Sequence, residues 1–366
     1  MFKKFLPWYL LALVVLSLAF IYGCGSSPTG GGGATTHGTY SYHGTQSPGD
    51  VWSWTISAET FFGSNETTGM WLTGTWETLP AGFGKATVST SEGLDHPSAG
   101  DKAYFLEFPN TMLLVKPDNQ GDSRVMVCAA AAATAPDPGK FLFVNIPKSG
   151  WVSSDAAFGT VEASLTSGKW HFNVTNFLIT GELQGNDDGT ADDFVYSNGT
   201  FTCESGPSTN LKIFMTPSNV FFGDSGPGEG GFAGAKYDAT ITDINNVLNH
   251  TYKGVRFIHY PGGASNNTGE TEPITAVASN DGVGMWASSY SDIDTSALPG
   301  SGVNITFESS PVNGFTRGYV EDIGTGQPEI IQAAVSRIGA DQKYMIYGIG
   351  LDERNRSFNF LIIQTD

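Results

Sequence analysis

Apolar and polar residues alternate along short segments of this chain, and no other sequence feature constrains its fold as strongly. Trp52, Trp54 and Ile56 alternate with polar residues, and the same period of two runs through 169–175 and 302–308. Because successive side chains of a strand point to opposite faces, such segments predict half-buried strands. Gly, Asn and Pro are frequent between them and favour turns. We therefore expect an all-β protein.

The strand-like segments are spaced most regularly in the C-terminal part of the chain, 239–366. Eight strands are predicted there, at 252–260, 273–279, 283–292, 302–309, 314–321, 328–338, 342–351 and 357–365. Short loops between them predict an antiparallel β-meander, as an up-and-down barrel or a sandwich. The last two strands are apolar on both faces, which predicts that they are central or covered by another domain. A second β-meander domain is expected over 38–238, and one short helix around 243–249.

The first 24 residues have the order of an export signal. Lys3 and Lys4 are followed by a segment, 5–22, that is apolar apart from Ser17, and Gly23 precedes Cys24. A basic start, an apolar core and a small residue are typical of a secretory signal. The core of 18 residues is also long enough to span a bilayer as an uncleaved anchor.

The end of this segment, Ile21-Tyr22-Gly23-Cys24, resembles the lipobox of bacterial lipoprotein precursors, which has an aliphatic, a variable and a small residue before Cys. The resemblance implies that residues 1–23 are removed as a signal peptide. It also implies that Cys24 carries a thioether-linked diacylglyceride. An uncleaved anchor and ordinary secretion are the alternatives.

A linker, 24–37, follows the signal. Residues 25–36 read GSSPTGGGGATT, which predicts a flexible tether with an end-to-end distance of about 20 Å. Gly25 stands where the inner-membrane retention signal of the lipoprotein class has Asp, so the resemblance implies the outer membrane of a bacterial cell envelope. The sequence leaves open whether the body faces the periplasm or the cell surface.

The chain is strongly acidic, with 18 Lys and Arg against 36 Asp and Glu and a formal net charge of −18. Such a body repels phosphate, which excludes nucleic acid as a partner. Anionic lipid headgroups repel it too, so we expect the N-terminal lipid to hold the protein on the membrane. A protein or a small-molecule ligand is the expected further partner, and the sequence does not identify it.

Two cysteines remain when Cys24 carries lipid. In an exported chain, Cys128 and Cys203 most simply form one disulfide, which would place both residues in one domain. The alternative is two separate buried thiols, because free Cys behaves as a small apolar residue.

The segment 186–193 resembles a calcium loop of the DxDxDG type. Asn186, Asp188, Thr190 through its carbonyl, and Asp192 stand at alternate positions, with a Gly at the bend. Calcium requires several converging oxygens at such a spacing. The alternative is an acidic, solvated hairpin tip without a cation, and no other cofactor is indicated.

No catalytic residue is predicted. The run Gly-Asp-Ser-Gly at 223–226 resembles the motif of trypsin-like serine proteases, but Pro227 follows it, and none of the six histidines stands in that family's Ala-Ala-His-Cys context. We therefore expect a lipid-anchored envelope protein that is not an enzyme and acts as a binding or structural module. The alternatives are an extracytoplasmic hydrolase whose site assembles only in three dimensions, and a ligand-carrying β-barrel.

Overall fold

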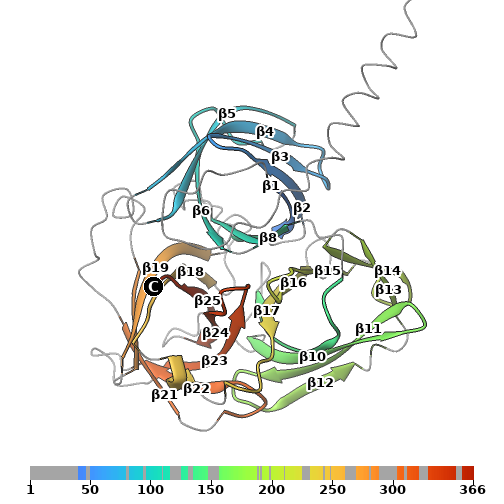
Figure 1. Cartoon of the computed structure of the whole chain (residues 1–366), viewed down its shortest axis with the longest axis vertical. Coiled ribbons are helices and arrows are strands. Elements are labelled where there is room, and N and C mark those ends of the chain that lie inside the picture. The colour runs from blue at the N-terminus through green and yellow to red at the C-terminus, as the bar shows by residue number, and fades with distance from the viewer. Residues whose placement is uncertain are drawn as a thin grey trace, which may run out of the picture.

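The protein folds into three antiparallel β-sheets that lie side by side (Figure 1). The computed structural model describes residues 40–46, 50–79, 82–93, 96–108, 110–115, 125–130, 135–146, 156–187, 189, 192–197, 199–209, 211–224, 231–241, 244–247, 249–259, 269–279, 282–287, 303–308, 311–320, 329–351 and 357–366. The predicted signal peptide, Cys24 and the linker lie outside these residues. No helix among the described residues is long and apolar enough to cross a membrane.

The first sheet is a closed barrel in which each strand pairs with the next and the last pairs with the first. Its strands are β1 (Tyr40–Gln46), β2 (Asp50–Ile56), β3 (Thr60–Asn65), β4 (Trp71–Thr78), β5 (Gly84–Glu92), β6 (Lys102–Phe108), β7 (Thr111–Val115) and β8 (Val125–Ala130). Gly44 of β1 faces Cys128 of β8 at the closure. A Cβ at position 44 would lie 2.2 Å from the Val127 carbonyl oxygen, so the closure requires a glycine there.

The second sheet has the order β10-β9-β17-β16-β15-β14-β13-β11-β12. Its strands are β9 (Gly139–Ile146), β10 (Ala157–Thr166), β11 (Lys169–Leu178), β12 (Leu183–Asp187), β13 (Asp193–Ser197), β14 (Thr200–Ser205), β15 (Lys212–Met215), β16 (Val220–Asp224) and β17 (Gly231–Lys236). Strand β10 also pairs with β11, so the ladder returns on itself through eight strands. Strand β12 pairs with β11 next to β13 and lies outside that ring.

The third sheet is a second closed barrel of eight strands. These are β18 (Thr251–His259), β19 (Gly269–Ser279), β20 (Gly282–Ala287), β21 (Val303–Phe307), β22 (Thr316–Val320), β23 (Glu329–Ile338), β24 (Lys343–Leu351) and β25 (Ser357–Gln364). The expected helix near 243–249 is a 3₁₀ turn, η3 (Ile244–Val247), whose residues Ile244 and Val247 pack in the apolar cluster of this barrel.

Each ring of strands is filled by side chains on the inward face of the alternation. Trp52, Trp54 and Trp76 belong to the cluster inside the first barrel. The second ring encloses an aromatic cluster in which Phe172 and Phe201 have centroids 5.2 Å apart. These interiors follow from the period of two, because every second residue of each strand points inward.

The outward faces of the three sheets meet in one further apolar cluster. It combines Leu113 of the first barrel, Leu142 and Val144 of the second sheet, and Tyr347 and Leu361 of the third. Residues from all three sheets are buried in this cluster, which joins the sheets into one packed body.

The prediction of an all-β fold with an eight-stranded C-terminal meander is confirmed, and that meander closes as an up-and-down barrel. The range 38–238 holds two sheets. The division of the chain into folding domains at 238 stays a prediction.

Candidate functional site

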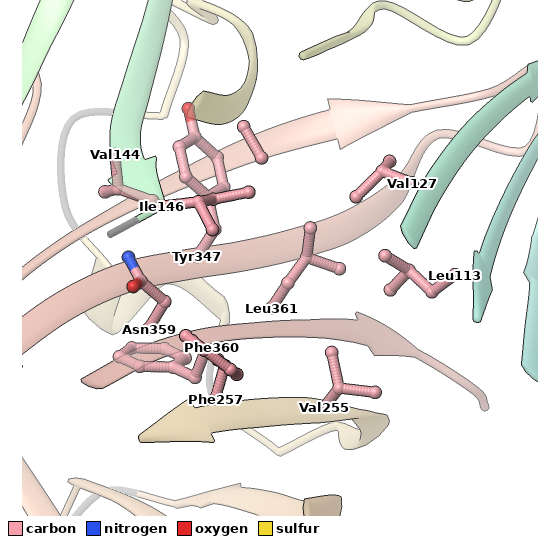
Figure 2. A pocket seen from close by; sticks show the side chains of 11 residues that line it. Leu113, Val127, Val144, Ile146, Val255, Phe257, Tyr347, Asn359, Phe360 and Leu361 are labelled. Carbon is pink, nitrogen blue, oxygen red and sulfur yellow. The ribbon is translucent and has the colours of Figure 1, made fainter. Parts of the chain in front are cut away.

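A cavity of about 40 Å³ lies where the three sheets meet (Figure 2). Strands β7 and β8 of the first barrel, β9 and β17 of the second sheet, and β18, β24 and β25 of the third all contribute to its wall. The lining residues are Leu113, Val127, Val144, Ile146, Ala233, Val255, Phe257, Tyr347, Asn359, Phe360 and Leu361. The atoms that face the cavity are apolar, although Tyr347 and Asn359 are among the lining residues.

The alternation of side chains along β25 decides which of its residues face the other two sheets. Phe358 and Ile362 point into the third barrel, whereas Leu361 and Ile363 belong to the cluster shared by the three sheets. Asn359 stands two positions before Leu361 and so shares its outward face. The prediction that the last two strands are covered by another part of the chain is confirmed, because strand β9 packs against that face.

The amide of Asn359 is fixed on one side only. Its Nδ2 donates a hydrogen bond of 2.6 Å to the carbonyl oxygen of Asn145 in β9. Its Oδ1 is buried and has no hydrogen-bond partner among the described residues. A buried acceptor without a donor is uncommon in folded proteins and calls for a physical explanation.

Tyr347 has its hydroxyl committed elsewhere. The hydroxyl donates to the carbonyl oxygen of Leu142 at 3.2 Å and lies 3.5 Å from Ser336 Oγ. Burial raises the pKa of Tyr347 above its ordinary value, so the ring remains neutral at physiological pH. Among the described residues, the cavity therefore offers an apolar wall that presents neither a nucleophile nor a general base.

The residues of the predicted calcium loop are only partly described. Asp188 and Thr190 lie outside the described residues. Asn186 is in β12, and Asp192 is buried with its Oδ1 accepting the Ser208 N–H at 2.9 Å. Within the described part of the chain, no three His, Cys, Asp or Glu side chains gather into a metal site. Calcium at this loop stays a prediction.

The predicted disulfide between Cys128 and Cys203 is wrong, because both thiols are free and buried. Cys128 lies in the interior cluster of the first barrel, and Cys203 lies in that of the second ring. Each cysteine occupies an inward position of its own strand, so the two belong to separate interiors and cannot approach to bonding distance. The Cys203 thiol donates to the Ser205 carbonyl oxygen at 3.2 Å.

Sequence reasoning missed Asn359. One local signal could have drawn attention to it, since Asn359 is the only polar residue in the run 358–363 of a strand that is apolar on both faces. Its surroundings at the junction come from strands of the other two sheets. The alternation of residues along one strand does not predict where those strands lie.

Comparisons with known proteins give distant likenesses only. No protein-family model matches the chain, and no curated protein matches it. Among solved structures it is similar to intact Ap-TbpB with its N and C lobes, at 9% identity over 90% of this chain and 77% of that chain, with a TM-score of 0.22. It is similar to a double mutant of the vaccine antigen transferrin binding protein B from Haemophilus parasuis Hp5, at 8% identity over 90% of this chain and 76% of that one, with a TM-score of 0.25. It is also similar to the isotype 1 transferrin binding protein B from serogroup B Neisseria meningitidis, at 12% identity over 87% and 65% of the chains, with a TM-score of 0.24. TM-scores this low have no bearing on what the chain does.

Proposed function

We propose that this chain is a lipid-anchored protein of the bacterial cell envelope that acts as a non-enzymatic binding module. The lipid is on Cys24, the linker 24–37 carries the body, and the outer membrane is the site of anchoring. The lipobox-like sequence at 21–24 supports the anchor.

One structural observation carries the binding role. Three rings of strands, each filled by its own side chains, pack through a shared apolar cluster. Filled interiors support recognition on the outside of the rings and at their junction over transport of cargo inside a barrel. Packing through one cluster holds the surfaces of the three sheets in a fixed relation, which lowers the entropy lost when a partner binds.

The anchor is tested by intact mass spectrometry of wild type, Cys24→Ala and Cys128→Ala, expressed in a two-membrane bacterium. We expect a diacylglyceride-sized gain in mass and loss of 1–23 in wild type and Cys128→Ala, and neither change in Cys24→Ala. A mature chain without added mass, or one that retains 1–23, would overturn the anchor.

The side of the membrane and the binding role need a second measurement. Protease added to whole cells cuts within 25–36 if the body stands on the surface, and cuts only after the outer membrane is permeabilised if it faces the periplasm. Cross-linking of whole cells should then yield one partner in stoichiometric amount with wild type, and much less of it with Cys24→Ala. Turnover of a substrate by the purified protein would instead support the hydrolase alternative.

A further inference from the structure

Strand β12 is the only strand of the described chain that pairs along one edge alone. Each of the other strands has a paired neighbour on both sides, either within a closed barrel or within the ring that β10 and β11 complete. Strand β12 pairs with β11 and lies at the outer margin of the second sheet (Figure 1). About half of its backbone N–H and C=O groups point away from the sheet, because these groups alternate between the two edges of a strand.

This open edge is accessible to a partner. Every residue of β12 is exposed except Gly185, which is half-buried. Open edges of natural sheets are commonly protected by Lys or Pro within the strand, and β12 contains neither. It does begin with a bulge, because Phe177 pairs with Leu183 and Asn176 pairs with Gly185, which leaves Gln184 as an extra residue. Beyond the bulge the strand continues in regular register to its end, so that part of the edge can accept a further strand.

Acidic residues flank the open edge. Glu182 precedes β12 and Asp187 ends it, both are exposed, and neither forms an ion pair within the described part of the chain. One Asp187 oxygen accepts the Gly189 N–H at 3.1 Å, which holds this carboxylate at the end of the strand. The surrounding segment, 172–211, contains six Asp or Glu and no Lys, Arg or His. A second copy of this edge would bring like charges together, which is unfavourable, whereas a basic strand would be attracted.

From the open edge and its charge we propose that β12 binds an extended basic segment of another protein, which joins the second sheet as a further strand. In this mode of recognition, backbone hydrogen bonds supply the affinity and side chains supply the selectivity. Lys or Arg side chains of the segment pair with Glu182 and Asp187. The side chain of Leu183, which is 64% exposed, offers one apolar contact beside them. This inference rests on the proposed binding function and names a class of partner for it.

Matched peptides, capped at both ends and equal in length, test the two parts of the proposal. The first alternates Thr and Lys, the second has the same sequence with a methyl group on every backbone nitrogen, and the third alternates Thr and Glu. Full-length protein is placed in nanodiscs of phosphatidylcholine, which has no net charge, and a chelator removes calcium. Hydrogen exchange of the backbone amides is then followed by mass spectrometry with each peptide.

We expect the Thr-Lys peptide to slow exchange in 183–187 by roughly tenfold, because an amide held in a hydrogen bond exchanges only when that bond opens. The methylated peptide should leave exchange unchanged, because it has no N–H to donate and its methyl groups keep the two backbones apart. The Thr-Glu peptide should also leave exchange unchanged, because its carboxylates are repelled by the acids of this edge.

Charge variants separate this edge from other acidic surfaces. The double variant Glu182→Gln with Asp187→Asn removes two exposed charges without a change of shape, and should weaken binding of the Thr-Lys peptide roughly three- to tenfold. Glu59→Gln with Asp341→Asn removes the same charge at exposed positions of the first and third sheets and should leave the affinity almost unchanged. The affinity is read from the dependence of the exchange rate on peptide concentration.

The remaining outcomes would each overturn a named part of the proposal. No slowing with the Thr-Lys peptide, or equal slowing with the methylated peptide, would overturn addition of a strand at β12. Equal slowing with the Thr-Glu peptide, or unchanged affinity in the Glu182→Gln, Asp187→Asn variant, would overturn a basic partner. Exchange in 183–187 that slows as the concentration of the protein alone is raised would show that a second copy occupies the edge, and would overturn the proposal.

The outcome is independent of anchoring. Failure of the Thr-Lys peptide to bind leaves the mass of the lipidated chain and its cross-linked partner unchanged, and would remove only this class of partner. Failure of the anchor would leave the exchange measurement unaffected, since it can then be made on the protein in solution.

Discussion

The side-chain amide of Asn359 donates a hydrogen bond of 2.6 Å to the backbone carbonyl of Asn145, 214 positions earlier in the chain. This bond joins the last strand of the third barrel to the first strand of the second sheet. In the neighbouring strand β24, Tyr347 donates to the Leu142 carbonyl, so two polar side chains of the third sheet bond to β9 at a mostly apolar junction. Polar bonds of this kind fix the relative orientation of surfaces that apolar packing alone would allow to slide.

Tyr347→Phe tests the contribution of one of these bonds. The substitution removes the hydroxyl and leaves the ring in place, and we expect the free energy of unfolding to fall by about 1 kcal/mol. Urea unfolding followed by tryptophan fluorescence measures it. Tyr319→Phe is the matched control, because its hydroxyl bonds to Glu308 at 2.7 Å in an exposed position where water replaces the lost partner. Equal losses of unfolding free energy in the two variants would show that the buried bond of Tyr347 contributes no more to stability than an exposed one.

Gly44→Ala tests the closure of the first barrel. The new Cβ would lie 2.2 Å from the Val127 carbonyl oxygen and 2.5 Å from Cys128 Sγ, so β1 and β8 must separate. We expect a loss of about 1–3 kcal/mol in the free energy of unfolding. Gly185→Ala in β12 is the control, because nothing in the described chain lies within 4 Å of its Cβ, and its effect should stay within about 0.5 kcal/mol. A Gly44→Ala variant as stable as wild type would mean that the close approach of β1 and β8 at this position is not needed for closure of the barrel.

The alternation of the sequence predicted much of the fold. Trp52 and Trp54 point inward as their spacing requires, and the two apolar faces of 357–365 correctly indicated a strand covered on both sides. The alternation does not state which strands close a ring. The pairing of Gly44 with Cys128 joins strands at opposite ends of a meander, and nothing local in the sequence marks it.

The same reason explains the errors at the cysteines and the candidate site. The expected oxidising compartment and the number of cysteines favour a disulfide between Cys128 and Cys203. Each thiol, however, lies on the inward face of a different ring of strands. The junction cavity is lined by apolar side chains from β8, β9 and β17 as well as by residues of the third barrel. Such a site depends on how whole sheets pack, which a pattern of residues along one strand does not contain.

Calcium binding at 186–193 remains to be tested by thermal unfolding. If the loop binds the cation, millimolar Ca²⁺ should raise the melting temperature of the protein, because a ligand that binds only the folded state stabilises it. Asp188→Ala should abolish that rise, whereas Asp137→Ala, at an exposed acid in another loop, should retain it. An unchanged melting temperature of the wild type on addition of Ca²⁺ would contradict the predicted calcium site.

The buried thiols predict a loss of stability in alkaline solution. Burial raises the pKa of Cys128 above its ordinary value of about 8.5. Above that pH the thiol ionises in the unfolded chain and stays protonated in the folded one, so the unfolded state binds fewer protons and the free energy of unfolding falls as pH rises. One such group contributes up to about 1.4 kcal/mol per pH unit. Burial, and next the Asp192 carboxylate, also raise the pKa of Cys203, which adds to the same slope.

Urea unfolding between about pH 8 and 9.5 measures this slope before the tyrosines, whose ordinary pKa is about 10, contribute. Cys128→Ala should retain only the part of the slope that comes from Cys203, and the double variant Cys128→Ala with Cys203→Ala should show almost none. Added reductant should change none of these values, because neither cysteine is in a disulfide. Identical pH slopes of the unfolding free energy in wild type and the double variant would contradict burial of the two thiols. A loss of stability on addition of reductant would show that the disulfide is present after all.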